Sequence, residues 1–484
     1  MRFPAITLLA ATPLAFAGHI KHGPTSQAFA SSSDGVYKLS EYSAPVKGTG
    51  SPGSNSTWSL SIDDTASGHK QTVKGFGAAV TDATVAVFNA LPAAQRAALL
   101  SQLMTSAGAN FALLRHTIAS SDLSADPSYS YDDNGGNVDT SLSSFNLGDR
   151  GNAMASMLAD MKALQPELTI LGSPWSPPGW MKLNGVIQGT TVNNNLNHAY
   201  ASQYGEYFVK YLQAYQAKGV NIDAITIQNE PLNSNAGFPT MYVYADESGN
   251  LIQQNVGPAL RAAGLDTAIW AYDHNTDVPS YPQTVLNEAS QYVNTVAWHC
   301  YASNNNWGVL TDFHNNNTNV EQYMTECWTS SSYTPWYQAA DFTMGPLQNW
   351  GNGVMAWTLG TDNSDGPHLS GSGPCDSCRG LVTVDTSAGT YTFQVDYYMM
   401  AQFSKFIPRG AVVLSGTGSY SYSSSSGLES VATLNPDGSR TVVIENKFAN
   451  NVYVTLTTKS GETWSGLVYA NSVTTWLLPA AGAA

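Results

Sequence analysis

The sequence has few basic residues. It contains 20 Lys and Arg residues against 35 Asp and Glu residues in a chain of 484, and its formal net charge is −15. Proteins that bind nucleic acid or anionic membranes need basic patches to contact phosphate groups. The composition therefore argues against both kinds of partner, and a neutral ligand is the simplest match.

Long apolar runs are also missing, apart from one near the N-terminus. Arg2 precedes the apolar run Ile6–Phe16, and small residues surround a cleavage site after Ala17. This is the pattern of a secretory signal peptide, and the run is too short to span a bilayer. We expect a secreted, extracellular protein with a signal peptide over residues 1–17 and a disordered, Ser-rich segment over residues 18–35.

Cysteine is scarce, with four residues in the chain. In an oxidising compartment, cysteines favour disulfides over metal sites. Cys375 and Cys378 lie in a Gly/Ser/Pro-rich loop, and a single CxxC pattern without a second pair of ligands is a weak zinc signal. We interpret it as a disulfide within the loop. No metal or cofactor pattern appears elsewhere in the sequence.

Two N-glycosylation sequons fit the secretory route. They are Asn55-Ser56-Thr57 and Asn316-Asn317-Thr318. Sequons also occur by chance, so Asn55 and Asn316 are candidate sites that glycan analysis must test.

Between residues 70 and 408, apolar runs typical of strands alternate with helical patterns. This alternation predicts a (β/α)8 barrel of the TIM type rather than an open doubly wound sheet, because eight repeats occur and no glycine-rich phosphate motif follows the first strand. The predicted strands are Thr72–Val80, Asn110–Ile118, Leu168–Pro174, Ile222–Gln228, Ala268–Tyr272, Thr295–Tyr301, Val320–Thr325 and Gly353–Leu359.

The alternation of strand and helix patterns ends at Pro408. Short β-type runs follow, and Asn435-Pro436-Asp437-Gly438 is a strong hairpin turn signal. The segment 36–69 has its own strand-like alternation around Trp58. We expect residues 36–69 and 409–484 to form a side β-sandwich together.

Two glutamates follow strand-like runs at positions where barrel enzymes carry out chemistry. Glu230 closes the fourth predicted strand within Gln228-Asn229-Glu230-Pro231, and Glu326 closes the seventh. Two facing carboxyl groups are the catalytic pair of a glycosidase. The alternative interpretation is that each is a solvated charge at a strand end, but the paired arrangement favours catalysis.

Polar and aromatic residues accompany this pair at other strand ends. A buried arginine needs a carboxylate partner, and Tyr301 is placed to hydrogen-bond Glu326. An ordinary core or turn role is the alternative for each of these residues. The candidate substrate-binding set is Arg115, Asp122, Trp175, Asn229, His299, Tyr301 and Trp357.

Strand alternation also predicts a disulfide between Cys300 and Cys327. If Glu326 points into the barrel mouth, its neighbour Cys327 points outward, and Cys300 does so on the adjacent sixth strand. Outward positions on neighbouring strands can reach the Cα separation that a disulfide needs. Two buried free thiols are the alternative.

The barrel segment resembles glycoside hydrolase family 30. The resemblance rests on KGFGAAVTDA at Lys74–Ala83, LLRHTIASSD at Leu113–Asp122, LGSPWSPPGWMK at Leu171–Lys182, and the QNEP and TEC motifs around the two glutamates. It implies a (β/α)8 barrel with a side β-sandwich, with Glu230 as general acid/base and Glu326 as nucleophile of a retaining double displacement.

Within that family, AYDHN at Ala271–Asn275 and CDSCRG at Cys375–Gly380 look most like fungal secreted endo-β-1,6-glucanases. This resemblance implies a β-glucan polysaccharide substrate and sugar contacts from Asp122, Trp175, Asn229 and Trp357. We also expect a monomer. A glucosylceramidase or xylanase on the same scaffold is the first alternative. A non-catalytic carbohydrate-binding protein is the second, and the presence of both glutamates argues against it.

Overall fold

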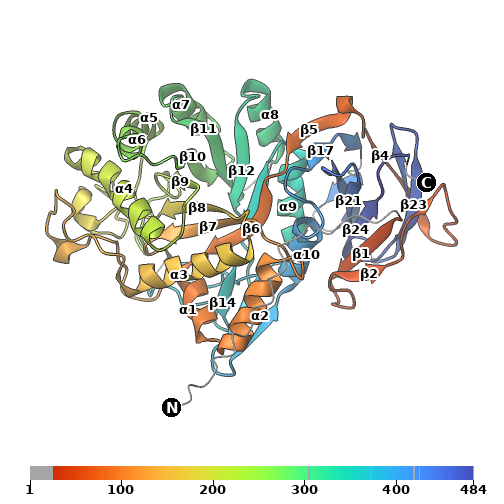
Figure 1. Cartoon of the computed structure of the whole chain (residues 1–484), viewed down its shortest axis with the longest axis horizontal. Helices are drawn as coiled ribbons and strands as arrows, with labels where there is room; N and C mark the ends of the chain where they lie inside the picture. The colour runs from red at the N-terminus through yellow and green to blue at the C-terminus, as the bar shows by residue number, and fades with distance from the viewer. Residues whose placement is uncertain are drawn as a thin grey trace, which may run out of the picture.

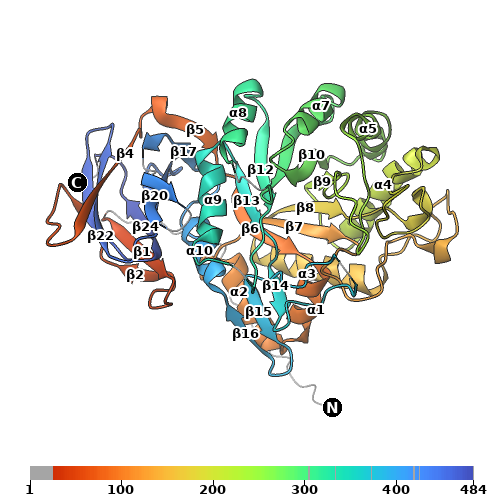
Figure 2. The same cartoon turned by 180° about the vertical axis from the view of Figure 1, so that it is seen from behind.

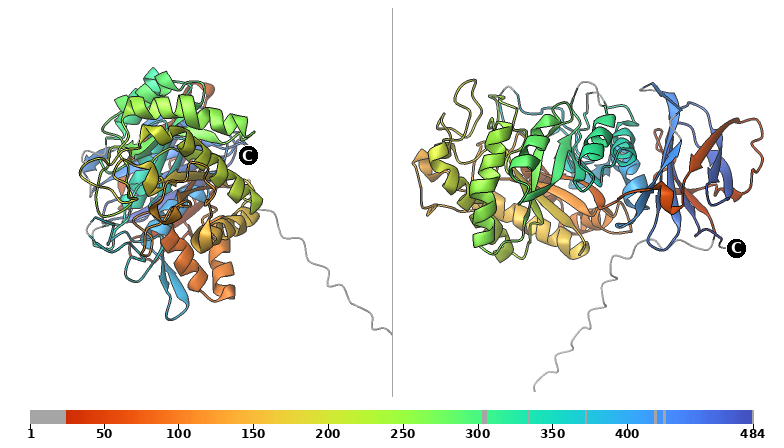
Figure 3. Two further views of the ribbon diagram at one scale, coloured as in Figure 1. Left: turned by 90° about the vertical axis from the view of Figure 1, so that its left-hand side faces the viewer. Right: turned by 90° about the horizontal axis from the view of Figure 1, so that it is seen from above.

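The computed structural model describes residues 25–302, 306–332, 334–371, 373–417, 420–423 and 426–482. The predicted signal peptide lies outside these residues. An α/β barrel and a β-sandwich stand side by side along the long axis of the molecule (Figure 1). The view from above in Figure 3 shows the same arrangement.

The predicted barrel is confirmed. Eight parallel strands close in chain order from β6 to β13, and the last strand pairs with the first. Each lies within or overlaps one of the predicted runs. The strands are β6 (Gly75–Val80), β7 (Leu113–Ile118), β8 (Thr169–Pro174), β9 (Ala224–Thr226), β10 (Ala268–Asn275), β11 (Val293–His299), β12 (Glu321–Glu326) and β13 (Gly353–Ala356).

Helices follow the barrel strands and cover the outside of the barrel. The first, α1, has an apolar, β-branched sequence, and the Thr81 side chain caps it by accepting from the Thr84 amide. The helices are α1 (Asp82–Ala90), α2 (Ala93–Met104), α3 (Gly148–Leu164), α4 (Ala201–Ala217), α5 (Ala245–Leu251), α6 (Gly257–Ala262), α7 (Ser280–Glu288), α8 (Gly308–Asn316), α9 (Gln338–Gln348) and α10 (Val395–Ser404). Among the described residues, no helix has the length and apolar character needed to cross a bilayer.

The sandwich combines strands from both ends of the chain, as predicted. One sheet has the order β2-β1-β24-β21-β20-β17-β5, with β19 beside β20, and the other has the order β18-β4-β22-β23-β3. A small sheet, β14-β15-β16, extends from the barrel. The strands are β1 (Gln27–Ser32), β2 (Ser40–Tyr42), β3 (Val46–Lys47), β4 (Ser56–Ile62), β5 (His69–Thr72), β14 (Gly360–Asp362), β15 (Val382–Asp385), β16 (Thr390–Phe393), β17 (Val412–Leu414), β18 (Gly416–Thr417), β19 (Tyr420–Ser423), β20 (Ser426–Leu434), β21 (Arg440–Asn446), β22 (Val452–Thr458), β23 (Thr463–Val468) and β24 (Ser472–Leu478).

Two predicted boundaries are wrong. Residues 27–32 form β1, although we expected disorder up to residue 35. This strand pairs along its whole length with β24 and buries Ala28 and Ala30, so long-range pairing orders a segment whose Ser-rich composition suggests a loop. The predicted domain boundary at residue 70 falls within β5, which belongs to the sandwich.

Helices α9 and α10 lie between the barrel and the sandwich (Figure 2). The Gln402 side chain of α10 donates to Ser31 of β1 at 2.7 Å, and Thr475 of β24 donates to the Gln402 carbonyl at 2.9 Å. Lys447 of the sandwich pairs with Asp341 of α9 at 2.5 Å. These buried polar contacts join the two parts of the molecule.

Candidate active site

A pocket of about 530 Å³ opens at the carboxyl ends of the barrel strands. Seven of the predicted site residues line it: Asp122, Trp175, Asn229, Glu230, Tyr301, Glu326 and Trp357. Arg115 and His299 are fully buried and contact these residues from below the pocket surface. The structure therefore brings the whole predicted set together.

The two glutamates reach the pocket in different ways. Glu326 is the last residue of β12, as predicted. Glu230 lies four residues beyond β9, which is shorter than expected, and its backbone φ is 45°. The Glu230 amide donates to the Asp273 carbonyl at 3.0 Å, and the Asn229 amide donates to the Pro174 carbonyl at 2.8 Å. Bonds to the two neighbouring strands thus hold the QNEP segment after the strand has ended.

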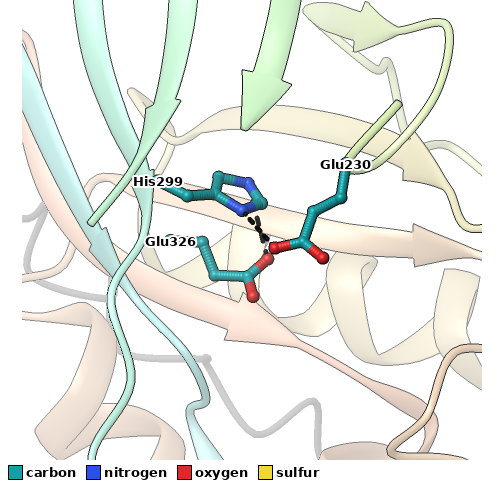
Figure 4. Close-up of side chains that lie close together, drawn as sticks. All are labelled: Glu230, His299 and Glu326. Carbon is teal, nitrogen blue, oxygen red and sulfur yellow. Dashed lines mark hydrogen bonds and ion pairs between the residues drawn. The ribbon is translucent and has the colours of Figure 1, made fainter. Parts of the chain in front are cut away.

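The carboxyl groups of Glu230 and Glu326 face one another, with His299 beside both (Figure 4). One carboxylate oxygen of each glutamate and one ring nitrogen of His299 lie within 4.8 Å of one another. Retaining glycosidases place their two carboxyl groups about 5–5.5 Å apart, whereas inverting enzymes need roughly 6.5–9.5 Å for a water. The short separation matches direct attack by one carboxylate.

Arg115 anchors the floor of the site. Its guanidinium group donates to Glu326 Oε2 at 2.9 Å, to Asn229 Oδ1 at 2.6 Å and to Asp273 Oδ2 at 2.8 Å. The prediction that this buried arginine needs a carboxylate partner is confirmed, and it has two such partners, Glu326 and Asp273. Because Arg115 is fully buried, its bonds orient Glu326 and Asn229 without presenting a free cation to the pocket.

Asp273 is a charged residue of the site that the sequence analysis did not select. It lies on β10, is fully buried, and accepts from Arg115 and from the hydroxyls of Ser173 (2.5 Å), Thr226 (2.8 Å) and Thr325 (2.7 Å). Burial alone raises its pKa, but Arg115 and His299 outweigh that effect and hold the pKa well below the usual range. The sequence did offer a signal for Asp273. It is a lone acidic residue near the end of an apolar strand, and that strand neighbours the one that leads to Glu230.

We expect Asp273→Asn to destabilise the fold by about 3–5 kcal/mol, because it leaves the buried charge of Arg115 without its main partner. Urea unfolding measures this loss. The matched control is Asp160→Asn, which breaks the 2.7 Å pair with Arg96 on the surface, where Asp160 is 47% exposed. This control should cost about 1 kcal/mol or less. Equal losses in the two variants would contradict the role of the buried network.

His299 connects the acidic residues of the site. Its Nδ1 lies 3.1 Å from Glu230 Oε1, and its Nε2 lies 3.0 Å from Asp273 Oδ1 and 3.6 Å from Glu326 Oε2. Glu230, His299 and Glu326 have the ligand types of a metal site. However, both ring nitrogens already face carboxylates, an arrangement that suits a proton on each nitrogen.

The electrostatics of the site give the two glutamates different proton affinities. Burial raises the pKa of Glu326 to about 7, although His299 and Arg115 oppose the shift. Burial also acts to raise the pKa of Glu230, but the hydrogen bond from His299 and the nearby His274 lower it to about 2. Burial acts to lower the pKa of His299, and the surrounding carboxylates raise it to about 9.

Glu230 and Glu326 lie so close together that they titrate as a coupled pair. Between about pH 2 and about pH 7 the pair holds one proton. One carboxylate and one carboxylic acid are the protonation state that a retaining glycosidase needs. The hydrogen bond from His299 favours the ionised form of Glu230, whereas burial favours the protonated form of Glu326.

Aromatic side chains form the pocket wall. Trp175 and Trp357 stack with ring centroids 5.2 Å apart, and the Arg115 guanidinium lies 4.8 Å from the Trp175 ring centre. Phe238 and Trp328 also line the pocket and were not predicted. The signal for Trp328 was its place directly after the TEC motif; Phe238 comes from a loop with no strand-end pattern.

Asp122 lies at the side of the pocket. Its Oδ2 accepts from the Cys375 amide at 3.4 Å, and its buried Oδ1 has no hydrogen-bond partner within the described residues. Burial raises its pKa to about 6. An unpaired carboxylate oxygen at a pocket wall suits a hydroxyl-bearing ligand.

Both predicted disulfides are present. Cys300 and Cys327, the residues that directly follow β11 and β12, are joined with their Cα atoms 5.3 Å apart, and Cys375 pairs with Cys378 within its loop. The first disulfide flanks Glu326, to which the Tyr301 hydroxyl donates at 2.9 Å. Tyr301 therefore makes the contact that its strand position predicts.

Comparison with known proteins assigns both parts of this architecture to one family. A family model described as the glycosyl hydrolase family 30 TIM-barrel domain matches residues 73–407, and the family 30 beta sandwich domain matches residues 410–476. The chain belongs to glycosyl hydrolase family 30. As a member of that family it is a retaining glycoside hydrolase, which agrees with the short distance between its two glutamates.

Family 30 members similar to this chain include two fungal proteins named as endo-1,6-beta-D-glucanases. The protein from Neurospora crassa is 73% identical over 482 residues, which are 99% of each chain. The protein from Aspergillus fumigatus is 64% identical over 492 residues, covering 99% of this chain and 100% of its own. A solved structure described as an endo-beta1,6-glucanase has a TM-score of 0.81 and 26% identity, covering 94% of this chain and 99% of that chain.

Proposed function

We propose that this protein is a secreted endo-β-1,6-glucanase that hydrolyses β-glucan with retention of configuration. The proposed substrate rests on the 73% identity to an endo-1,6-beta-D-glucanase along essentially the whole chain. The short separation of Glu230 and Glu326 supports the double displacement.

In the first step, Glu326 attacks the anomeric carbon of the bound glucose and forms a covalent glycosyl-enzyme. The bond to the leaving 6-hydroxyl breaks as Glu230 donates its proton to that oxygen. Arg115 and Tyr301 hydrogen-bond the two oxygens of Glu326, which keeps the attacking carboxylate in one orientation. In the second step Glu230 takes a proton from water, and the water oxygen displaces Glu326.

The proton must move to the Glu230 side before the first step, and His299 supports this transfer. His299 approaches both carboxyl groups, and Asp273 holds its ring in place. When a sugar displaces water from the pocket, the leaving oxygen next to Glu230 gives that carboxyl a hydrogen-bond acceptor. A protonated Glu230 is thereby stabilised at the moment when it must act as an acid.

We expect kcat/KM to show a bell-shaped pH dependence, with its alkaline limb near pH 7, where the pair loses its last proton. His299→Gln removes a positive charge, so ionisation of both glutamates becomes harder and the alkaline limb should move upward by about one pH unit. The control His198→Gln changes a histidine whose side chain is 70% exposed and should leave the profile unchanged. An unshifted limb in His299→Gln would contradict the bridging role.

The main alternative is a glucosylceramidase or xylanase on the same scaffold. A xylanase that depends on acidic side groups of xylan needs a basic residue open to the cleft. No Lys or Arg is among the described residues that line the pocket, and Arg115 is fully buried. Incubation with β-1,6-glucan, β-1,3-glucan, xylan and glucosylceramide in parallel tests the substrate. Short gluco-oligosaccharides from β-1,6-glucan alone are the expected product, and release of glucose alone would contradict endo cleavage.

We further propose that the protein is secreted as a monomer after cleavage behind Ala17, and that Asn55 and Asn316 carry glycans. Asn316 is exposed at the end of α8, and Asn55 is partly exposed just before β4. Mass spectrometry of the secreted protein reads the N-terminus and the occupancy of both sequons.

A further inference from the structure

A second groove, of about 610 Å³, lies among loops of the β-sandwich. Its walls come from three segments that are far apart in the sequence, residues 54–56, 449–451 and 469–470. They are the start of β4, the loop between β21 and β22, and the turn between β23 and β24. The groove is therefore built by the fold of the sandwich, and it shares no residue with the pocket of Glu230 and Glu326.

The chemistry of this groove suits a neutral sugar. Apart from Asn55, the proposed glycan site at its edge, its walls present the amides of Asn450 and Asn451, serine hydroxyls, and the ring of Tyr469. Amides and hydroxyls both donate and accept hydrogen bonds, as sugar hydroxyls do. An aromatic ring offers an apolar face with a polar tip, which suits the C–H face of a pyranose. Within the described part of the chain, no residue that lines the groove carries a formal charge.

Two more tyrosines extend the aromatic surface beside the groove. Tyr37 and Tyr42 come from the β1–β2 hairpin, and their ring centroids lie 4.9 Å and 6.2 Å from that of Tyr469. All three side chains remain partly exposed. The carboxylate of Asp34, in the same hairpin, interacts with the Tyr469 hydroxyl and raises the pKa of Tyr469. The cluster therefore places partly exposed rings on one side of a polar groove.

Buried hydrogen bonds hold the groove in one shape. The side-chain amide of Asn446, which is fully buried, donates to the carbonyls of Asn450 at 3.1 Å and Tyr469 at 2.8 Å. Asn451 Oδ1 accepts from the Ala470 amide at 2.9 Å. Because the loops are already fixed, little conformational entropy is lost when a ligand binds.

We propose that this groove is an accessory binding site for a neutral β-glucan segment, with Tyr469 as its stacking platform. The inference rests on the proposed function, because a polymer substrate offers further sugar units to a second site on the same enzyme. Occupation of both sites by one polymer or particle raises the effective concentration of glycosidic bonds at the pocket. The site is not needed for substrates that fill the pocket alone.

The test compares binding and hydrolysis separately. Binding is measured in the inactive Glu326→Gln background by retardation in gels that contain linear β-1,6-glucan, with β-1,3-glucan gels as a second arm. All proteins carry Asn55→Gln, so that no attached glycan can fill the groove. We expect Tyr469→Ala to weaken retention in β-1,6-glucan about threefold to tenfold. In the active enzyme the same change should slow hydrolysis of insoluble glucan and leave hydrolysis of a short soluble β-1,6-oligosaccharide unchanged.

Two variants control for the ring and for general effects of removing a tyrosine. Tyr469→Phe keeps the stacking face and should retain most of the binding. Tyr244→Ala removes an exposed tyrosine of the barrel, 58% accessible, and should leave retention unchanged. Equal retention of Tyr469→Ala and its parent would overturn the accessory site while the oligosaccharide assay still reports activity. Failure of the parent enzyme to cut that oligosaccharide would instead refute the proposed function.

Discussion

Glu326→Gln should lower the hydrolysis of β-1,6-glucan by about 10⁴-fold or more, the scale seen when the nucleophile of a coupled catalytic set is removed. A neutral amide cannot form the glycosyl-enzyme, and no other carboxylate takes its place, because Asp273 is fully buried behind Arg115. The amide keeps the shape of the side chain, so the fold should persist. Steady-state hydrolysis and thermal unfolding together measure the two effects.

The matched control for this variant is Glu321→Gln at the other end of the same strand. Glu321 pairs with Lys74 at 2.9 Å and is 39% exposed, so the identical chemical change should leave activity near that of the parent. A small anion can add a second test. Azide added to Glu326→Ala with an activated aryl glucoside should give the α-glucosyl azide by a single displacement. Formation of the β-product would assign the nucleophile to another residue.

Glu230→Gln should lower the hydrolysis of β-1,6-glucan by roughly 10²–10⁴-fold, the usual contribution of a general acid. The leaving 6-hydroxyl of glucose is a poor leaving group without a proton. An aryl glucoside with an acidic phenol needs little assistance, so its first step should remain fast. The second step still lacks a base, and the glycosyl-enzyme should accumulate. Stopped-flow measurements should show a burst of about one equivalent of phenol per enzyme.

The control for this variant is Glu206→Gln, an exposed position on α4. Azide should accelerate turnover of the aryl glucoside by Glu230→Ala, because azide attacks the glycosyl-enzyme without a general base, and the product should be the β-glucosyl azide. If Glu230→Gln lowered the rates of hydrolysis of both substrates equally and showed no burst, the assignment of Glu230 as acid/base would be wrong.

The pH behaviour depends on groups that belong to four different strands. Arg115 lies on β7, Asp273 on β10, His299 on β11 and Glu326 on β12. Only their convergence gives the pair of glutamates its single shared proton across the acidic range. The proposed accessory groove has the same character, since its walls come from segments separated by almost four hundred residues.

The sequence by itself determined the barrel, the sandwich and the positions of the two glutamates, because each depends on local patterns. Alternating apolar runs specify strands, and prolines or polar residues end them. The period-two geometry of a strand was enough to predict the Cys300–Cys327 disulfide and the contact of Tyr301 with Glu326, although Cys300 also lines the pocket.

Only the tertiary structure decided the charge network and the order of β1. Asp273 is 158 residues from Arg115 and 26 from His299, and its low pKa comes from both. Likewise, Gln27–Ser32 becomes a strand because β24, more than four hundred residues away, supplies its hydrogen-bond partners. Electrostatic and pairing energies depend on distance in space, and a sequence pattern records only distance along the chain.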